Sequence, residues 1–151
     1  GVNSMKLRSA DTIIGCDIVP RNYDADLLVV TSDGFGKRTK LSEFRSQNRG
    51  GIGLIATKFK SNMSRLVALT IVEEKDEIML VTANGIVTRI KAGDISCQGR
   101  PATGVRAQNL TDNDTVVSVN KIVNTDSSKD DISDEGCLTE VTDGEQTTLT
   151  E

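Results

Sequence analysis

The sequence contains no histidine and no tryptophan, and its 151 residues include only one tyrosine and three phenylalanines. The absence of histidine removes the commonest general base and a frequent metal ligand. The shortage of aromatic side chains argues against a surface that binds single-stranded nucleic acid, because such surfaces stack bases on aromatic rings. Nothing in this composition favours an independent enzyme.

Cysteines and long apolar runs are also scarce. Cys16, Cys97 and Cys137 are isolated and odd in number, so they form neither a Cys-x-x-Cys zinc pattern nor a disulfide framework. No apolar run approaches the ~20 residues of a membrane span, and no N-terminal stretch has the pattern of a signal peptide. We therefore expect free thiols in a reducing cytoplasm and no contact with a membrane.

The charges are segregated along the chain. Residues 124–151 carry nine acidic groups and one basic group, whereas residues 1–123 carry 17 basic and 13 acidic groups. A basic body predicts a surface for a polyanion. The tail is poor in apolar residues and is predicted to be disordered. Because of its charge, we also expect it to compete with that polyanion for the basic surface.

The most informative pattern is an internal repeat with an offset of 51 residues. Val-Thr-Ser-Asp-Gly at residues 30–34 recurs as Val-Thr-Ala-Asn-Gly at residues 81–85. At the same offset Arg38 matches Arg89, Lys40 matches Lys91, Arg49 matches Arg100, and Gly53 matches Gly104.

The second half of the unit repeats as well, and it fixes the expected boundaries. Gly-Val-Arg-Ala at residues 104–107 is similar to residues 53–56 and to residues 1–4. The chain thus opens within a unit. We predict the end of one unit at residues 1–26, full units at 27–76 and 77–123, and an acidic tail at 124–151.

Each unit is predicted to consist of short β-strands. Asp33-Gly34 and Asn84-Gly85 are turn dipeptides typical of tight hairpins. No segment has a convincing helical period, although Leu41–Arg45 suits one short turn. Four strands in ~50 residues is the period of a propeller blade, so the fold class is all-β. The expected strands are Leu27–Thr31, Gly36–Leu41, Gly53–Phe59, Leu66–Val72, Ile78–Thr82, Ile86–Lys91, Gly104–Leu110 and Val116–Val123.

Basic side chains recur at matching places in the two units. Alternate residues of a strand share a face, so Arg38 and Lys40 should project together, as should Arg89 and Lys91, from an exposed face. Repetition would place such groups on one track that follows the phosphates of duplex DNA. Alternatively, these charges only solvate exposed strands. The candidate DNA-binding residues are Lys37, Arg38, Lys40, Arg45, Arg49, Lys58, Lys60, Arg89, Lys91, Arg100 and Arg106.

A glycine-rich loop supplies a second candidate site. In residues 47–53, Gln47, Gly50, Gly51 and Gly53 accompany Arg49, and glycines allow a backbone to approach a phosphate closely. An alternative is that a loop entering a strand needs permissive backbone whatever it binds. The loop is not a G-x-G-x-x-G nucleotide motif, since no strand–glycine–helix unit surrounds it.

These motifs resemble a known family. Asp33-Gly34-Phe35-Gly36-Lys37-Arg38-Thr39 followed by the glycine loop is similar to the C-terminal domain of the DNA gyrase A subunit, as is Gly99-Arg100-x-x-x-Gly104-Val105. The resemblance covers about residues 1–123. It implies a β-pinwheel of six four-stranded blades that exchange a strand between neighbours. It also implies that duplex DNA bends round a basic rim, so that the whole enzyme introduces negative supercoils.

The resemblance further implies the partners. These are duplex DNA, the N-terminal part of the A subunit with its DNA-cleaving tyrosine, and the ATP-using B subunit, in an A2B2 heterotetramer of the bacterial cytoplasm and nucleoid. This segment would bind no cofactor itself, because ATP and Mg act elsewhere in the assembly. The family's first-blade box is Gln-Arg-Arg-Gly-Gly-Lys-Gly, and Asn48 and Ile52 replace two of its basic residues here.

Other interpretations stay open at this point. The chain could be the equivalent region of topoisomerase IV or a propeller-like protein-interaction scaffold. Tyr23, the sole tyrosine, has no catalytic surroundings in the sequence. The acidic segments around Asp24 and Glu73 are expected to be solvated turns, not metal sites.

Overall fold

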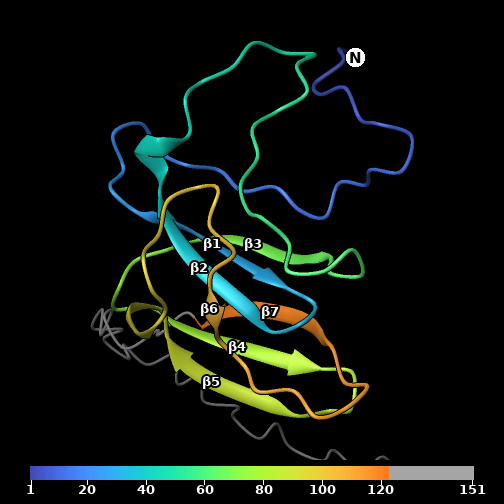
Figure 1. Ribbon diagram of the computed structural model, residues 1–151. Helices are drawn as coiled ribbons and strands as arrows, with labels where there is room; N and C mark the ends of the chain where they lie inside the picture. Colours follow the sequence, from blue (N-terminus) through green and yellow to red (C-terminus); the bar gives the residue numbers. More distant parts are fainter. Residues whose placement is uncertain (123–151) are drawn as a thin grey trace, which may run out of the picture.

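The computed structural model describes residues 1–122, which contain β-strands and two short 3-10 turns (Figure 1). The all-β prediction is confirmed, while the predicted tail at residues 124–151 lies outside the described residues. The strands are β1 (Asp26–Thr31), β2 (Phe35–Lys40), β3 (Leu66–Val72), β4 (Glu77–Thr82), β5 (Val87–Lys91), β6 (Val105–Arg106) and β7 (Val116–Ile122). The turns are η1 (Leu41–Glu43) and η2 (Ala92–Asp94).

The strands form two antiparallel sheets, with orders β3-β1-β2-β6 and β5-β4-β7. Figure 1 shows them one above the other, with the loops of residues 1–24 and 41–64 extending beyond the first sheet. The hairpins β1–β2 and β4–β5 turn at the predicted Asp-Gly and Asn-Gly dipeptides. Gly34 and Gly85 adopt φ of +77° and +83° there, a conformation that glycine allows at little cost.

The two units share one pattern of strand pairing. β1 pairs with β3 so that Thr31 faces Leu66, with an irregularity after Val30. β4 pairs with β7 so that Thr82 faces Val116, with an irregularity at the same place in the strand. The sequence repeat is therefore a structural repeat down to its β-bulge.

The fourth strand of the first sheet comes from the second unit. β6 pairs with the edge of β2, where Phe35 faces Arg106 and Gly36 faces Val105. Gly104 enters this strand with φ of +98°, and a Cβ there would lie 2.5 Å from the carbonyl oxygen of Gly36. Glycine is therefore needed for β6 to reach β2, and the sheet is completed only by strand exchange between units.

The core lies between the sheets and draws on both units. All six residues of β1 are buried because layers cover both of its faces. Residues 95–98 run along β2 and form a parallel bridge between Arg38 and Cys97. The cluster of buried apolar side chains consists of Leu28, Val30, Val72, Ile78, Leu80, Ala92, Ile95 and Val116.

Two strand predictions need correction. Gly53–Phe59 forms no strand, and the predicted strand Gly104–Leu110 is reduced to β6. By the repeat, Leu54–Ile55 is the equivalent of β6, and the described residues contain no sheet before β1 to which it could add. A strand needs a hydrogen-bonding neighbour, so equivalent positions of the repeat form a strand in one unit and no strand in the other.

Candidate nucleic-acid interface

The first two cations of β2 are buried, which corrects the expected exposed face. Lys37 is 0% exposed and Arg38 is 4% exposed. Lys37 and Arg38 point to opposite faces of β2, and residues 95–100 of the next unit meet both of them. Lys37 Nζ donates to the carbonyl of Gly99, and Arg38 Nε donates to the carbonyl of Ile95. The placement of Lys37 and Arg38 does not support direct contact with DNA, and we leave both out of the candidate surface.

Arg38 and Lys40 share a face of β2, as strand alternation predicts. Both reach the buried carboxylate of Asp26, with distances of 2.6 Å from Arg38 Nη1 and 3.2 Å from Lys40 Nζ. Arg38 Nε also donates to the carbonyl of Ile95. The hydrogen bond to Asp26 raises the pKa of Lys40. Lys40 is half exposed, but its charge is already balanced by a carboxylate.

A group of exposed cations gathers where the two units meet. The ammonium of Lys60 lies 4.6 Å from the centre of the Phe35 ring, and the guanidinium of Arg106 lies 5.5 Å from the same centre. The 53–60 loop reaches this place because the backbone N–H of Lys58 donates to the carbonyl of Ala102. The structure thus brings Lys58, Lys60 and Arg106 together from two units.

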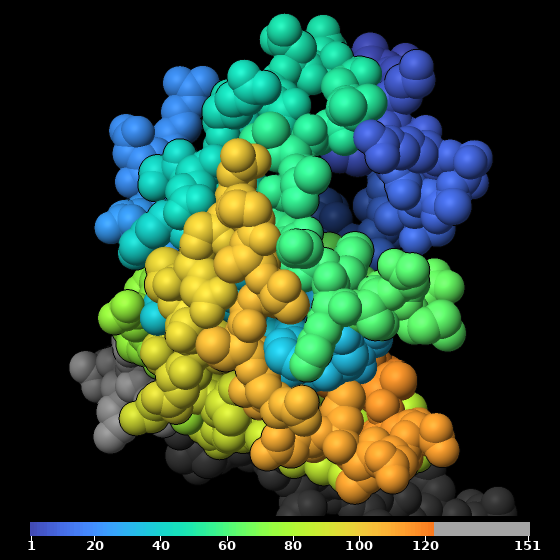
Figure 2. Space-filling view, viewed as in Figure 1, coloured from blue at the N-terminus to red at the C-terminus, as the bar shows by residue number. Residues whose placement is uncertain are grey.

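Arg100 lies on the same seam between the units. Its guanidinium lies 6.0 Å from the centre of the Phe44 ring, and its backbone N–H donates to Glu43 Oε2 over 3.2 Å. In Figure 2 the yellow segment around residue 100 lies between the teal and green loops of the first unit. We call Lys58, Lys60, Arg100 and Arg106 the junction surface.

The glycine-rich loop lines a hollow of its own. Gln47, Arg49, Gly50 and Gly51 line one shallow hollow together with Arg45. The N–H of Gly50 donates to the carbonyl of Ser4, and Met5 forms a parallel bridge with Gly51. Arg45 and Arg49 are exposed. Gly53 adopts φ of +83°, which fits the alternative that the loop simply needs permissive backbone.

The basic residues of β5 lie on the second sheet, away from the junction surface. Arg89 forms an ion pair with Glu77, and Lys91 is exposed at the end of the strand. The cations predicted from the sequence therefore do not form one track in this chain. They divide into the junction surface, the glycine loop and β5.

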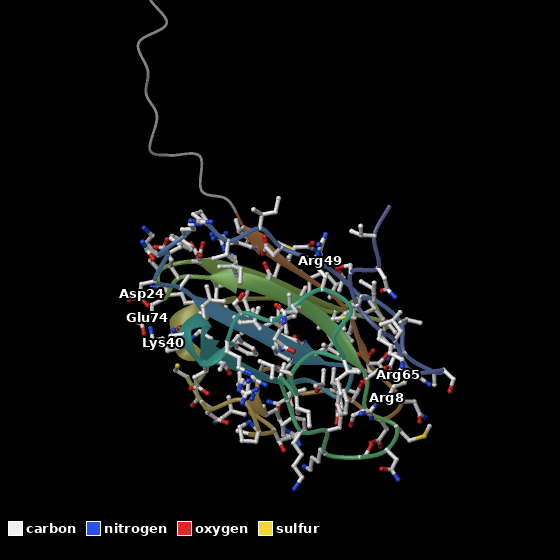
Figure 3. The ribbon with its side chains drawn as sticks, turned by 90° about the horizontal axis from the view of Figure 1, so that it is seen from above. Arg8, Asp24, Lys40, Arg49, Arg65 and Glu74 are labelled. Atoms are coloured by element: carbon white, nitrogen blue, oxygen red, sulfur yellow. The ribbon has the colours of Figure 1, made fainter. Side chains whose placement is uncertain are left out.

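Sequence reasoning missed two exposed arginines, Arg8 and Arg65. Figure 3 shows Arg8, Arg49 and Arg65 toward one end of the sheets, and Asp24, Lys40 and Glu74 toward the other. Arg8 also lines a hollow with Arg100. Neither Arg8 nor Arg65 belongs to a matched pair of the repeat, so the pattern gave no reason to select them.

No catalytic arrangement surrounds the sole tyrosine. The hydroxyl of Tyr23 donates to Glu73, and this bond raises the pKa of the tyrosine, which disfavours a phenolate nucleophile. Asp76 pairs with Lys121, and Glu73 pairs with Lys75. Among the described residues, no three histidine, cysteine or carboxylate side chains gather closely enough to hold a metal ion.

Comparison with known proteins decides the family. The model of the "DNA gyrase C-terminal domain, beta-propeller" family matches residues 25–73 and 76–122. The chain belongs to this family. Each of its two full units is thus matched, and the resemblance noted in the sequence is confirmed. No helix within residues 1–122 is long and apolar enough to cross a membrane.

Curated relatives within the family are DNA gyrase A subunits. The chain is 39% identical to the DNA gyrase A subunit of Synechocystis sp. in an alignment that covers 79% of the chain. It is 38% identical to the DNA gyrase A subunit of Staphylococcus epidermidis over 122 residues, or 81% of the chain. The chain spans only 17% and 14% of the lengths of these two relatives.

Solved structures agree on the fold. The C-terminal domain of a DNA topoisomerase IV superposes with a TM-score of 0.74 at 29% identity, covering 80% of this chain and 38% of that one. A DNA gyrase A C-terminal domain superposes with a TM-score of 0.61 at 36% identity, covering 66% of this chain and 34% of that one. The pinwheel fold implied by the resemblance is therefore confirmed.

Proposed function

We propose that this chain is part of the A subunit of a DNA gyrase, and that it binds and bends duplex DNA without doing chemistry itself. The observation that carries the proposal is the junction surface. Like charges repel, yet Lys60 and Arg106 come from different units to the same Phe35 ring. Cations held together in this way suit a polyanion, because phosphates neutralise them and release counterions.

The arrangement favours contact with the DNA backbone over recognition of the bases. The cations lie on loops and on a two-residue strand, and the described residues include no helix or long ribbon that would enter a groove. Contacts to phosphates position a protein on DNA but carry little sequence information. Repeated contacts of this kind offset the energy of bending the duplex.

The wider role follows from the family. In the proposed assembly, this chain would present wrapped DNA to the cleaving part of the A subunit, while the B subunit would use ATP to drive negative supercoiling. The assembly would be A2B2 and cytoplasmic, associated with bacterial DNA. The identity of 36–39% to gyrase A subunits supports gyrase. The superposition on a topoisomerase IV domain keeps that enzyme as the second candidate.

The test is duplex binding by the 151-residue chain across a salt series, measured by fluorescence anisotropy. The variant K58A/K60A/R106A removes three cations of the junction surface. The matched control R21A/K75A/K121A removes three exposed cations elsewhere. Each lost phosphate contact lowers the slope of log affinity against log salt by about 0.9, so we expect the junction variant to lose a slope of about 2 to 3.

The possible outcomes separate the candidate functions. A steep slope that flattens only in the junction variant supports the proposal. Equal flattening in both variants would show that binding depends on net charge and not on this surface. No salt-dependent binding by a chain whose circular dichroism shows folded β structure would contradict DNA binding and favour the protein-interaction scaffold.

A further inference from the structure

Arg100 is positioned by the unit that precedes its own. It stands in the Gln98–Gly104 loop, which the repeat makes the equivalent of the glycine-rich loop. Glu43 accepts a hydrogen bond from its backbone N–H, and Phe44 lies under its guanidinium. Thr39 Oγ1 donates to the carbonyl of Gln98 over 2.8 Å. The first unit therefore holds the loop of the second on several sides.

The strongest of these contacts comes from the buried ammonium of Lys37. Its Nζ donates to the carbonyl of Gly99 over 2.7 Å and also to the carbonyl of Arg100. A buried ammonium without acceptors is costly, and its N–H groups are satisfied here by two adjacent carbonyls. Lys37 thus holds the peptide group on each side of the Arg100 Cα, and with it the direction in which the Arg100 side chain leaves the loop.

Burying a charged ammonium costs folding free energy, so we expect a buried lysine to have a function at this position. Desolvation lowers the pKa of Lys37, while Glu43 acts to raise it. The side chain is 0% exposed, so its charge cannot touch a phosphate directly. Lys37 can therefore affect DNA binding only through the loop whose carbonyls it contacts.

The repeat provides an internal comparison. Thr88 is the residue of the second unit that matches Lys37, and within residues 1–122 no further loop packs on β5. Arg49 matches Arg100, and it is exposed in a loop whose backbone is bound by Ser4 and Lys6 instead. Of these two matching positions, the lysine is at the one in β2, on which the Gln98–Gly104 loop packs, and the threonine is at the one in β5.

We propose that Lys37 is a positioning residue that holds the Gln98–Gly104 loop so that Arg100 presents its guanidinium to a DNA phosphate. The proposal rests on the DNA-binding function proposed above. In this proposal the DNA-binding site around Arg100 is built by two units. The second unit supplies the arginine, and the first unit supplies the residues that hold its loop.

The test is a double-mutant cycle on duplex affinity. Lys37→Met keeps the length of the side chain and removes its donors, and Arg100→Ala removes the proposed contact. Residues that act through one another give non-additive effects. We expect each single variant to weaken binding several-fold, and K37M/R100A to bind no more weakly than R100A alone. Independent, multiplying losses would overturn the proposal.

A second variant separates positioning from loss of charge. Thr39→Val removes the bond to Gln98 without changing the charge. If Lys37 acted only through long-range attraction, T39V would bind DNA like the original chain. Positioning predicts weaker binding by T39V as well, with a smaller change than in K37M. Unchanged binding in T39V together with a loss in K37M would contradict the proposal.

A measurement without DNA keeps the proposal distinct from the proposed function. Amide hydrogen exchange reports local opening. K37M should speed the exchange of residues 98–104 and leave β4 and β7 unchanged. Slow exchange retained in that loop would overturn the positioning role even if DNA binds. Faster loop exchange in a folded chain that binds no DNA would contradict the proposed function and leave Lys37 as a support for the loop only.

Discussion

The guanidinium of Arg38 lies 2.6 Å from the carboxylate of Asp26, and both side chains are at least 95% buried. The pair recurs 51 residues later as Arg89 and Glu77, but there the arginine side chain is 56% exposed. The same sequence element thus forms a buried ion pair where a following unit covers it, and a surface ion pair where the described residues provide no such cover.

This difference predicts unequal effects on stability. Arg38→Met removes the buried partner of Asp26 and leaves that carboxylate with only the half-exposed Lys40. Loss of one partner of a buried pair costs about 3–5 kcal/mol. Arg89→Met breaks an exposed pair, which is worth about 0–1 kcal/mol. The measurement is urea unfolding followed by circular dichroism. Equal shifts of the unfolding midpoint in the two variants would show that burial does not distinguish the pairs.

Gly104 and Gly85 provide a second matched comparison. Both have positive φ, but a Cβ at Gly104 would lie 2.5 Å from the carbonyl of Gly36, whereas a Cβ at Gly85 meets nothing within 4 Å. Gly85→Ala should cost about 1 kcal/mol from backbone strain alone. Gly104→Ala should cost more than about 2 kcal/mol, because it also forces β6 off β2. Unfolding in urea measures both, and a similar cost at the two sites would contradict the strand-exchange geometry.

The ring of Phe35 is predicted to contribute to DNA binding by ordering Lys60 and Arg106. A cation on an aromatic face gains about 0.5–1 kcal/mol at an exposed site. Phe35→Leu keeps an apolar side chain but loses both interactions, so we expect duplex affinity to fall by at most about 5- to 30-fold. Phe59→Leu is the control, because Phe59 lies in the same loop as Lys60 and is exposed. Equal affinity of the two variants would remove the ring from the site.

Acid should destabilise the chain partly through Asp33. Burial acts to raise its pKa, but hydrogen bonds from Ser64 and Thr31 outweigh it and hold the pKa below the ordinary 3.8. Its stabilising contribution is therefore present above about pH 4 and is lost as the pH falls through the lowered pKa. Asp33→Asn should flatten this part of the curve of unfolding midpoint against pH. Asparagine suits this turn, because Asn84 occupies the matching position of the second unit.

The control for the acid experiment is Asp112→Asn, at an exposed loop residue. It should leave the acid dependence of the original chain in place. If D33N and D112N had the same profile as the original chain, the hydrogen bond from Ser64 would not contribute to acid sensitivity.

Most of the strands could be predicted from the sequence, because their signals are local. Two turn dipeptides, runs of β-branched residues and a repeat place β1, β2, β3, β4, β5 and β7 within one or two residues. The hairpin registers follow, because a tight turn fixes which residues face each other. The resemblance to the gyrase family also came from local motifs, and the family match confirmed it.

The tertiary structure alone decided which cations are exposed. Alternation along β2 correctly places Arg38 and Lys40 on one face, but it cannot show that residues 95–100 of the next unit cover both faces of that strand. The same is true of Leu54–Ile55 and Val105–Arg106, which occupy equivalent positions of the repeat and have different structures. A strand exists only where another backbone accepts its hydrogen bonds, and a lysine is a surface residue only where nothing packs over it. Both conditions depend on contacts between units, which local sequence does not encode.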